Sequence, residues 1–220
     1  MVDHLDKTVS GRKVIKMNKV IYAYRLVDDT GFAPCVDNGL FSLACCKGGQ
    51  VRNGRNIKTG LRYHVGKYKQ EFPNDEIYLL GIYHNRLLYY AKVTNVMDMT
   101  EYFSEKRKKE FGRRKDHIYD VKGGALERND FVPFIHEKGD VRNVQDANGV
   151  FVLLSSQFTY FGRKAPDLSK DLLTVLPRNR ETKKYIGATT QGINIHERIM
   201  DIVKPFRGAV DKPHEEIDFA

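Results

Sequence analysis

Long apolar stretches are missing from this chain and cysteines are few, which excludes several classes of protein. No apolar run approaches the roughly 18 residues that a membrane-spanning helix needs. Residues 1–19 are charged and lack a hydrophobic middle, so we expect no signal peptide. Three cysteines, two of them adjacent, do not make a disulfide framework. These shortages predict a reduced, cytoplasmic protein that does not associate with membranes.

Positive charge is in excess. The chain has 37 Lys and Arg against 28 Asp and Glu, a net charge of +9, and a pI near 9.3. Such an excess suits nucleic acid, nucleotides or an anionic surface as partner. With 220 residues, 41% of them hydrophobic, the chain can build a real core. We predict a single domain over residues 19–206, after a flexible basic arm at 1–18 and before a polar tail at 207–220.

Local patterns predict both strands and helices. β-branched, aromatic and alternating runs predict strands, and the His84–Asn85 pair suits a two-residue hairpin turn. The predicted strands cover residues 19–27, 76–83, 86–96 and 149–154, with a weak strand at 61–65. Helices are predicted at 98–111, where Thr100 is the expected cap, at 167–176 and at 193–203. Residues 40–46 suit either a strand or a helix, 116–145 suit an irregular loop, and 157–162 suit an aromatic turn.

The segment 34–55, PCVDNGLFSLACCKGGQVRNGR, contains a glycine-rich loop with Lys47, Arg52 and Arg55. Glycines expose backbone N–H groups and the cations add positive charge, and both features suit a phosphate. We predict that these three cations contact a ligand. Just upstream, Asp37 and Asn38 either form an ordinary turn or present polar groups that read a base edge.

Cys45 and Cys46 have three interpretations. Lys47 and the glycine loop favour a lowered thiol pKa, as a nucleophile needs, but no histidine is near in sequence. A zinc site needs a CxxC spacing, which is absent, so we expect no metal. The third interpretation is small packing residues. Candidate catalytic residues are therefore Cys45, Cys46 and, as an acid–base group, Asp37; no cofactor is expected.

Other candidate ligand contacts are scattered along the chain. Arg25 lies in an apolar strand and needs either a partner or solvent. Tyr160 and Phe161 precede a glycine, and we predict that they lie in a loop where their rings stack on a base. A run of seven cations exceeds what helix capping requires and predicts contacts with a nucleic-acid backbone. This basic run consists of Lys106, Arg107, Lys108, Lys109, Arg113, Arg114 and Lys115.

Several pieces, in order, resemble the nucleotide modification associated domain 2 family. They are YAYRLV, DTGFAPCVDNGLFSLACCKGGQVR, LLYYAKVTNVMDMTEYF and VLLSSQFTYFG, and together they span roughly residues 21–173. The resemblance implies a phage or bacterial protein linked to DNA base modification, which would act in the host cytoplasm if a phage encodes it. Members usually carry a Gly-Asp-Trp step before the strand hairpin. Here residues 72–76 read FPNDE, without the tryptophan.

A second resemblance, in topology only, is to PUA-like barrels, in which aromatic side chains hold a flipped-out base. The fold expected is therefore α+β, with a curved and mostly antiparallel sheet forming a PUA-like β-barrel with added helices. We expect a nucleic-acid or nucleotide binding module linked to DNA modification or phage–host conflict. The alternatives are an enzyme acting on a nucleotide or modified base, and a phage effector that binds a host defence protein.

Overall fold

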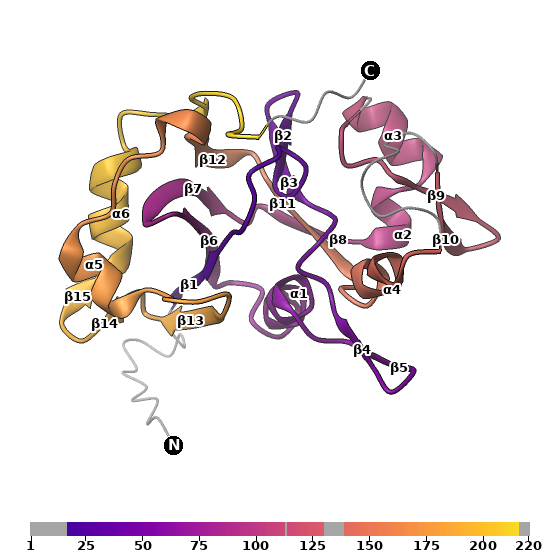
Figure 1. Ribbon diagram of the computed structural model, residues 1–220, viewed down its shortest axis with the longest axis horizontal. Helices are drawn as coiled ribbons and strands as arrows, with labels where there is room; N and C mark the ends of the chain where they lie inside the picture. The colour runs from indigo at the N-terminus through magenta and orange to yellow at the C-terminus, as the bar shows by residue number, and fades with distance from the viewer. Residues whose placement is uncertain (1–16, 113, 130–138, 216–220) are drawn as a thin grey trace, which may run out of the picture.

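Two β-sheets pack face to face at the centre of the molecule (Figure 1). The structure is a computed structural model that describes residues 17–112, 114–129 and 139–215. The larger sheet has the strand order β13-β1-β6-β7-β12-β16, and the smaller one β2-β3-β11-β8. Two neighbouring pairs, β1 with β6 and β12 with β16, are parallel, and all other neighbours in both sheets are antiparallel.

The strands of both sheets are short or of moderate length. In the larger sheet they are β13 (Thr182–Ile186), β1 (Lys19–Arg25), β6 (Glu76–Tyr83), β7 (Arg86–Lys92), β12 (Gln157–Tyr160) and β16 (Gly208–Ala209). In the smaller sheet they are β2 (Cys35–Asp37), β3 (Leu40–Leu43), β11 (Phe151–Ser155) and β8 (Asn95–Asp98). Three separate hairpins are β4 (Gln50–Arg52) with β5 (Arg55–Ile57), β9 (Tyr119–Lys122) with β10 (Ala125–Arg128), and β14 (Thr189–Thr190) with β15 (Ile193–Asn194).

The helices are α1 (Leu61–Glu71), α2 (Met99–Tyr102), α3 (Glu105–Phe111), α4 (Val141–Ala147), α5 (Lys170–Val175) and α6 (Ile195–Val203), with a 3-10 turn η1 at Gly162–Lys164. Helices α5 and α6 cover the outer side of the larger sheet and α2, α3 and α4 lie beyond the smaller one, whereas α1 packs into the core between the two sheets (Figure 1). No helix among the described residues is long and apolar enough to cross a membrane.

Alternation along β1 shows how the layers arise. Val20, Tyr22 and Tyr24 face the smaller sheet and α1, whereas Ile21 and Ala23 face α5 and α6. Successive side chains of a strand point to opposite faces, so a strand buried on both faces contributes to two cores. A third core lies on the far face of the smaller sheet, against α2 and the β9–β10 hairpin.

Most of the predicted elements are present. The hairpin turn is confirmed, since His84 and Asn85 have φ angles of 48° and 67° between β6 and β7. The strands at 19–27 and 149–154 and the helices at 167–176 and 193–203 are found with shifted ends. Residues 40–46 form β3 followed by a bend.

Other predictions were wrong. Residues 61–65 belong to helix α1, and 157–160 form strand β12 instead of a turn. The single helix at 98–111 is two helices, because Asp98 caps α2 and Ser104 caps α3, and Thr100 caps neither. The segment 116–145 is more regular than expected, since it contains the β9–β10 hairpin and the start of α4. The mixed α+β class and the mainly antiparallel pairing are confirmed, but the described strands form no closed barrel, so the PUA-like barrel is not confirmed.

The buried carboxylate of Asp29 holds the C-terminal segment against the larger sheet. It accepts hydrogen bonds from the Tyr160 hydroxyl at 2.5 Å and from the His214 backbone N–H at 3.0 Å, and the His214 ring Nδ1 lies 2.8 Å away. β16 pairs with β12 just before this contact. The described part of the predicted polar tail, up to Glu215, is thus attached to the domain, whereas 216–220 and residues 1–16 of the arm predicted at 1–18 lie outside the described residues.

Gly81 in β6 is required by a close approach of an aromatic ring. A Cβ atom at this position would lie 2.2 Å from Cε1 of Tyr89, whose side chain is fully buried. Overpacking of a core costs roughly 1–3 kcal/mol. Gly81→Ala should therefore lower the free energy of unfolding, measured by urea denaturation, by about 1–3 kcal/mol. The control Ser156→Ala, at an exposed turn, should stay within about 0.5 kcal/mol of the wild type, and equal stability of the two variants would contradict this account.

Candidate functional site

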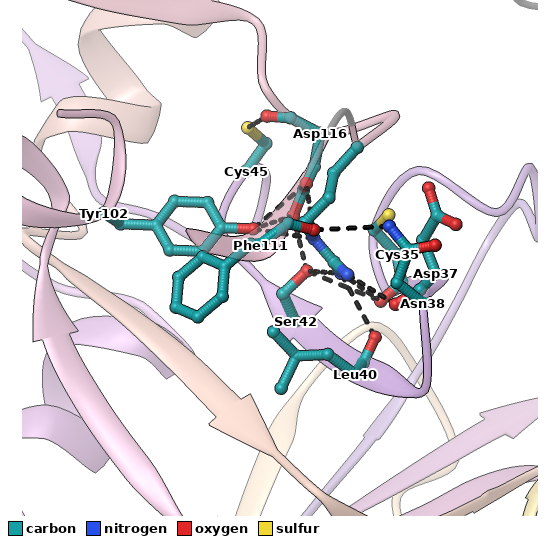
Figure 2. Close-up of polar contacts among 10 residues, drawn as sticks. Cys35, Asp37, Asn38, Leu40, Ser42, Cys45, Tyr102, Phe111 and Asp116 are labelled. Carbon is teal, nitrogen blue, oxygen red and sulfur yellow. Dashed lines mark hydrogen bonds and ion pairs between the residues drawn. The ribbon is translucent and has the colours of Figure 1, made fainter. Parts of the chain in front are cut away.

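The Asp37–Asn38 turn joins β2 to β3 (Figure 2), and the buried side chain of Arg114 holds it. Arg114 donates hydrogen bonds to the carbonyl oxygens of Asp37 at 2.6 Å and Leu40 at 3.1 Å, and to Ser42 Oγ at 2.8 Å. The carboxylate of Asp116 lies 3.4 Å from its Nε. A buried cation with this many partners is satisfied, so Arg114 stabilises the turn.

Asp116 is the second member of this network. Its carboxylate accepts hydrogen bonds from the Ser42 hydroxyl at 2.5 Å and the Tyr102 hydroxyl at 3.0 Å. Burial raises the pKa of Tyr102 well above its usual range, so the phenol keeps its proton and acts as donor. Figure 2 shows the carboxylate of Asp37 pointing away from these groups. The network therefore fixes the turn while the Asp37 side chain stays outside it.

The predicted basic run is dispersed by the structure. Arg114 is 1% exposed, so its predicted contact with a nucleic-acid backbone was wrong. In α3, Arg107 forms ion pairs with Glu101 and Glu110, and Lys108 pairs with Asp120. Lys106 and Lys109 are exposed, Lys115 is partly buried, and Arg113 lies outside the described residues. Nearby carboxylates thus neutralise part of the predicted basic run.

The glycine-rich loop is packed against its own protein. The N–H of Cys46 donates to Asp146 Oδ1 at 2.6 Å, and that of Gly49 donates to the Gln145 carbonyl at 2.7 Å. A Cβ at Gly48 would lie 2.0 Å from the same carbonyl oxygen. These glycines permit close backbone contact, and the two amides are not available to a phosphate, in contrast to the prediction.

Arg62 connects this loop to the smaller sheet. Its fully buried guanidinium donates to the carbonyl oxygens of Cys46 at 2.7 Å, Phe151 at 2.7 Å and Asp146 at 2.5 Å. Lys47, on the same loop, lies over the ring of Tyr24, with Nζ 5.3 Å from the ring centroid. Burial lowers the pKa of Lys47. Sequence analysis missed Arg62, because one cation in a mixed polar segment carries no sign of burial.

The cysteines lack the surroundings of a nucleophile. Cys45 is fully buried, and burial raises its pKa well above the usual range. Cys46 is partly exposed, but desolvation by the surrounding protein raises the pKa of its thiol to about 12. All three cysteines are free. Within the described residues, no group of three or more His, Cys, Asp or Glu side chains is placed to hold a metal ion.

The predicted aromatic and strand contacts also have internal partners. Tyr160 packs in the core between the two sheets, and Phe161, which follows β12, packs in the core on the other face of the larger sheet. Each is 2% exposed, so neither offers the open stacking face that was predicted. Arg25 donates to the carbonyl of Pro177 at 2.6 Å and to Asn85 Oδ1 at 2.8 Å. A cavity of about 400 Å³ is lined by Tyr160 and by Val36, the neighbour of Asp37. Arg52 does not line this cavity; it lines a separate hollow formed by the β4–β5 hairpin.

Arg52 and Arg55 belong to the β4–β5 hairpin, which projects from the body of the molecule (Figure 1). Together with the following residue, this segment (50–58, QVRNGRNIK) is called the basic hairpin below. Asn53 and Gly54, with φ angles of 50° and 69°, form its two-residue turn. Arg52 lies directly opposite Arg55 in the register, and both are exposed. Like charges placed opposite each other destabilise a strand pair.

The model of the nucleotide modification associated domain 2 family matches residues 17–218. The chain belongs to this family. The resemblance seen in the sequence is therefore confirmed over nearly the whole chain, and the family name links it to nucleotide modification. No curated protein and no solved structure matches the chain.

Removal of Arg114 from this family member should strongly destabilise it. Arg114→Met leaves the carboxylate of Asp116 buried without its cation, and breaking a buried pair costs about 3–5 kcal/mol. The free energy of unfolding, measured by urea denaturation, should fall by about this amount. Lys109→Met, in the same predicted basic run but exposed, should change stability by less than about 0.5 kcal/mol. Similar stabilities for both variants would show that Arg114 is not a structural residue.

The thiols of this family member should react slowly. A raised pKa leaves almost no thiolate at neutral pH, and the thiolate is the reactive form. In the folded protein at about pH 7, iodoacetamide should alkylate Cys45 and Cys46 at least about a hundredfold more slowly than free cysteine. Denaturant should restore ordinary rates. Fast alkylation of either residue in the folded protein would support the catalytic interpretation instead.

Proposed function

We propose that this protein binds nucleic acid and that the basic hairpin is its main contact. The observation that carries the proposal is a pair of arginines, Arg52 and Arg55, held opposite each other at an exposed position. Neither has a side-chain hydrogen bond or ion pair within the described residues, and the hairpin contains no acidic residue. A polyanion would offset the repulsion that the fold leaves uncompensated.

The composition of the hairpin suits recognition of a duplex. Arginine and lysine contact phosphates or guanine, and asparagine can bond to adenine in the major groove. Arg52, Arg55 and Lys58 supply the cations, and Asn53 and Asn56 supply the amides. A two-stranded β-ribbon fits the major groove of B-DNA, whereas the major groove of A-form RNA is too narrow for side chains to read. The proposal therefore favours double-stranded DNA.

Family membership supports the same direction. The family name associates the domain with nucleotide modification. Binding of DNA by the hairpin would place the protein where modified bases occur. Of the enzymatic alternatives, the cysteine route has the least support, because burial disfavours both thiolates. Arg114 binds the backbone carbonyl of Asp37, whose carboxylate stays outside the network.

The test compares two double variants with the same change in charge. Arg52→Glu with Arg55→Glu should weaken binding to a DNA duplex at least about tenfold. The plot of log affinity against log salt, which falls as salt rises, should become less steep by about 2, one for each lost contact. Lys106→Glu with Lys109→Glu, in α3, should have a much smaller effect. Affinity is measured by fluorescence anisotropy over a salt series, with single-stranded DNA and double-stranded RNA as comparison ligands.

Three outcomes would contradict the proposal. The first is a wild type that binds none of these nucleic acids at low salt. The second is an equal loss of affinity in both double variants, which would point to net charge alone. Binding that is independent of salt would exclude phosphate contacts as its source. A stable complex with a host protein, in the absence of nucleic-acid binding, would support the effector hypothesis instead.

A further inference from the structure

A second cavity lies at the other end of the molecule from the basic hairpin, between α6 and strands β6, β7 and β12 (Figure 1). Its volume is about 340 Å³, within the range of small-molecule sites. The chain that follows α6, residues 204–207, completes its rim. None of the residues that line it is acidic.

Aromatic and apolar side chains make up its walls. Tyr78 and Tyr90 stack with ring centroids 5.2 Å apart and an interplanar angle of 6°. At the rim, Phe206 is 41% exposed and Met200 is 37% exposed, so both can contact a ligand in the cavity. An open aromatic ring next to a cavity suits the flat face of a base, and such stacking is worth about 1–3 kcal/mol per base.

Cations lie on the same rim. Lys204 and Arg207 are exposed and have no side-chain partner within the described residues. Lys92, which also lines the cavity, is already paired with Glu76. The two unpaired cations, which flank Phe206 in the sequence, can bind a phosphate group, and arginine can do so with two parallel hydrogen bonds.

His196 supplies a donor from the wall of the cavity. Its Nδ1 lies 2.8 Å from the hydroxyl of Tyr90. Burial raises the pKa of Tyr90 well above its usual range and lowers the pKa of His196, so near neutral pH the phenol donates and the imidazole is uncharged. A neutral imidazole that accepts at Nδ1 carries its proton on Nε2. His196 therefore has one N–H left to offer to an oxygen or nitrogen atom of a ligand.

We propose that this cavity binds a nucleoside monophosphate unit, with the base against Phe206, its edge near His196 and the phosphate on Lys204 and Arg207. This site goes beyond the contact proposed for the basic hairpin, because it needs neither the hairpin nor a duplex. The unit is either a free mononucleotide or one nucleotide of a single strand. Both have the same base, sugar and phosphate, so the experiment distinguishes the two sources.

The test measures binding of the ribo- and deoxyribonucleoside 5′-monophosphates by isothermal titration calorimetry. At least one should bind the wild type with a Kd below about 1 mM, and the matching nucleoside and inorganic phosphate should each bind much more weakly. Lys204→Glu with Arg207→Glu should lower the affinity at least about tenfold. His196→Phe, which keeps a ring and removes the donor, should lower it about threefold or more.

Controls separate this site from the basic hairpin. Arg52→Glu with Arg55→Glu and Lys106→Glu with Lys109→Glu carry the same charge change and should keep mononucleotide affinity within about twofold of the wild type. A single-stranded oligonucleotide that displaces the mononucleotide identifies a strand as the source, and one that does not identifies the free nucleotide. Absence of mononucleotide binding to the wild type, or equal losses in all three double variants, would overturn the proposal, whatever the result with duplex DNA.

Discussion

The position of the basic hairpin depends on the hydrogen bonds of one buried side chain, the guanidinium of Arg62. Three carbonyl oxygens, from the loop before the hairpin, from α4 and from β11, converge on one side chain. The carboxylate of Asp146 is 3.8 Å from the same guanidinium and also accepts from the backbone of that loop. Arginine suits this place, because its five donors are fixed in one plane. The loop is thereby held rigid at the root of the hairpin.

A similar arrangement recurs at Arg114, at the β2 edge of the smaller sheet. There the cation satisfies the carbonyl oxygens of the β2–β3 turn, and Asp116 balances its charge. Buried ion pairs are costly unless their remaining hydrogen-bonding groups are satisfied, and both arginines meet that condition with backbone oxygens. The protein thus uses two buried cations to shape loops and leaves others, such as Arg52 and Arg55, exposed.

How much of this was visible in the sequence depends on how local the determining forces are. The β6–β7 hairpin and α6 were predictable, since alternation, a two-residue turn and an apolar stripe are local patterns. Helix α1 was not predicted, since its first residues were expected to form a weak strand at 61–65. Its Gly66 lets the helix approach the ring of Phe151, a contact with a residue distant in sequence. In the basic run, only contacts with distant residues decide that Arg114 is buried and Lys109 exposed. Of the predicted ligand contacts, Arg52 and Arg55 in the β4–β5 hairpin and Lys106 and Lys109 in α3 are left exposed without a partner in the described structure.

The attachment of β16 also affects how the larger sheet ends. An exposed strand edge presents unpaired N–H and C=O groups, and another chain can pair with them. Here the outer edge of β12 is occupied by a strand of only two residues, and Asp29 anchors the segment that follows it through His214. Such a short strand offers very little backbone for a further strand to join. The C-terminal segment therefore covers this edge of the larger sheet and disfavours strand pairing between one molecule and the next.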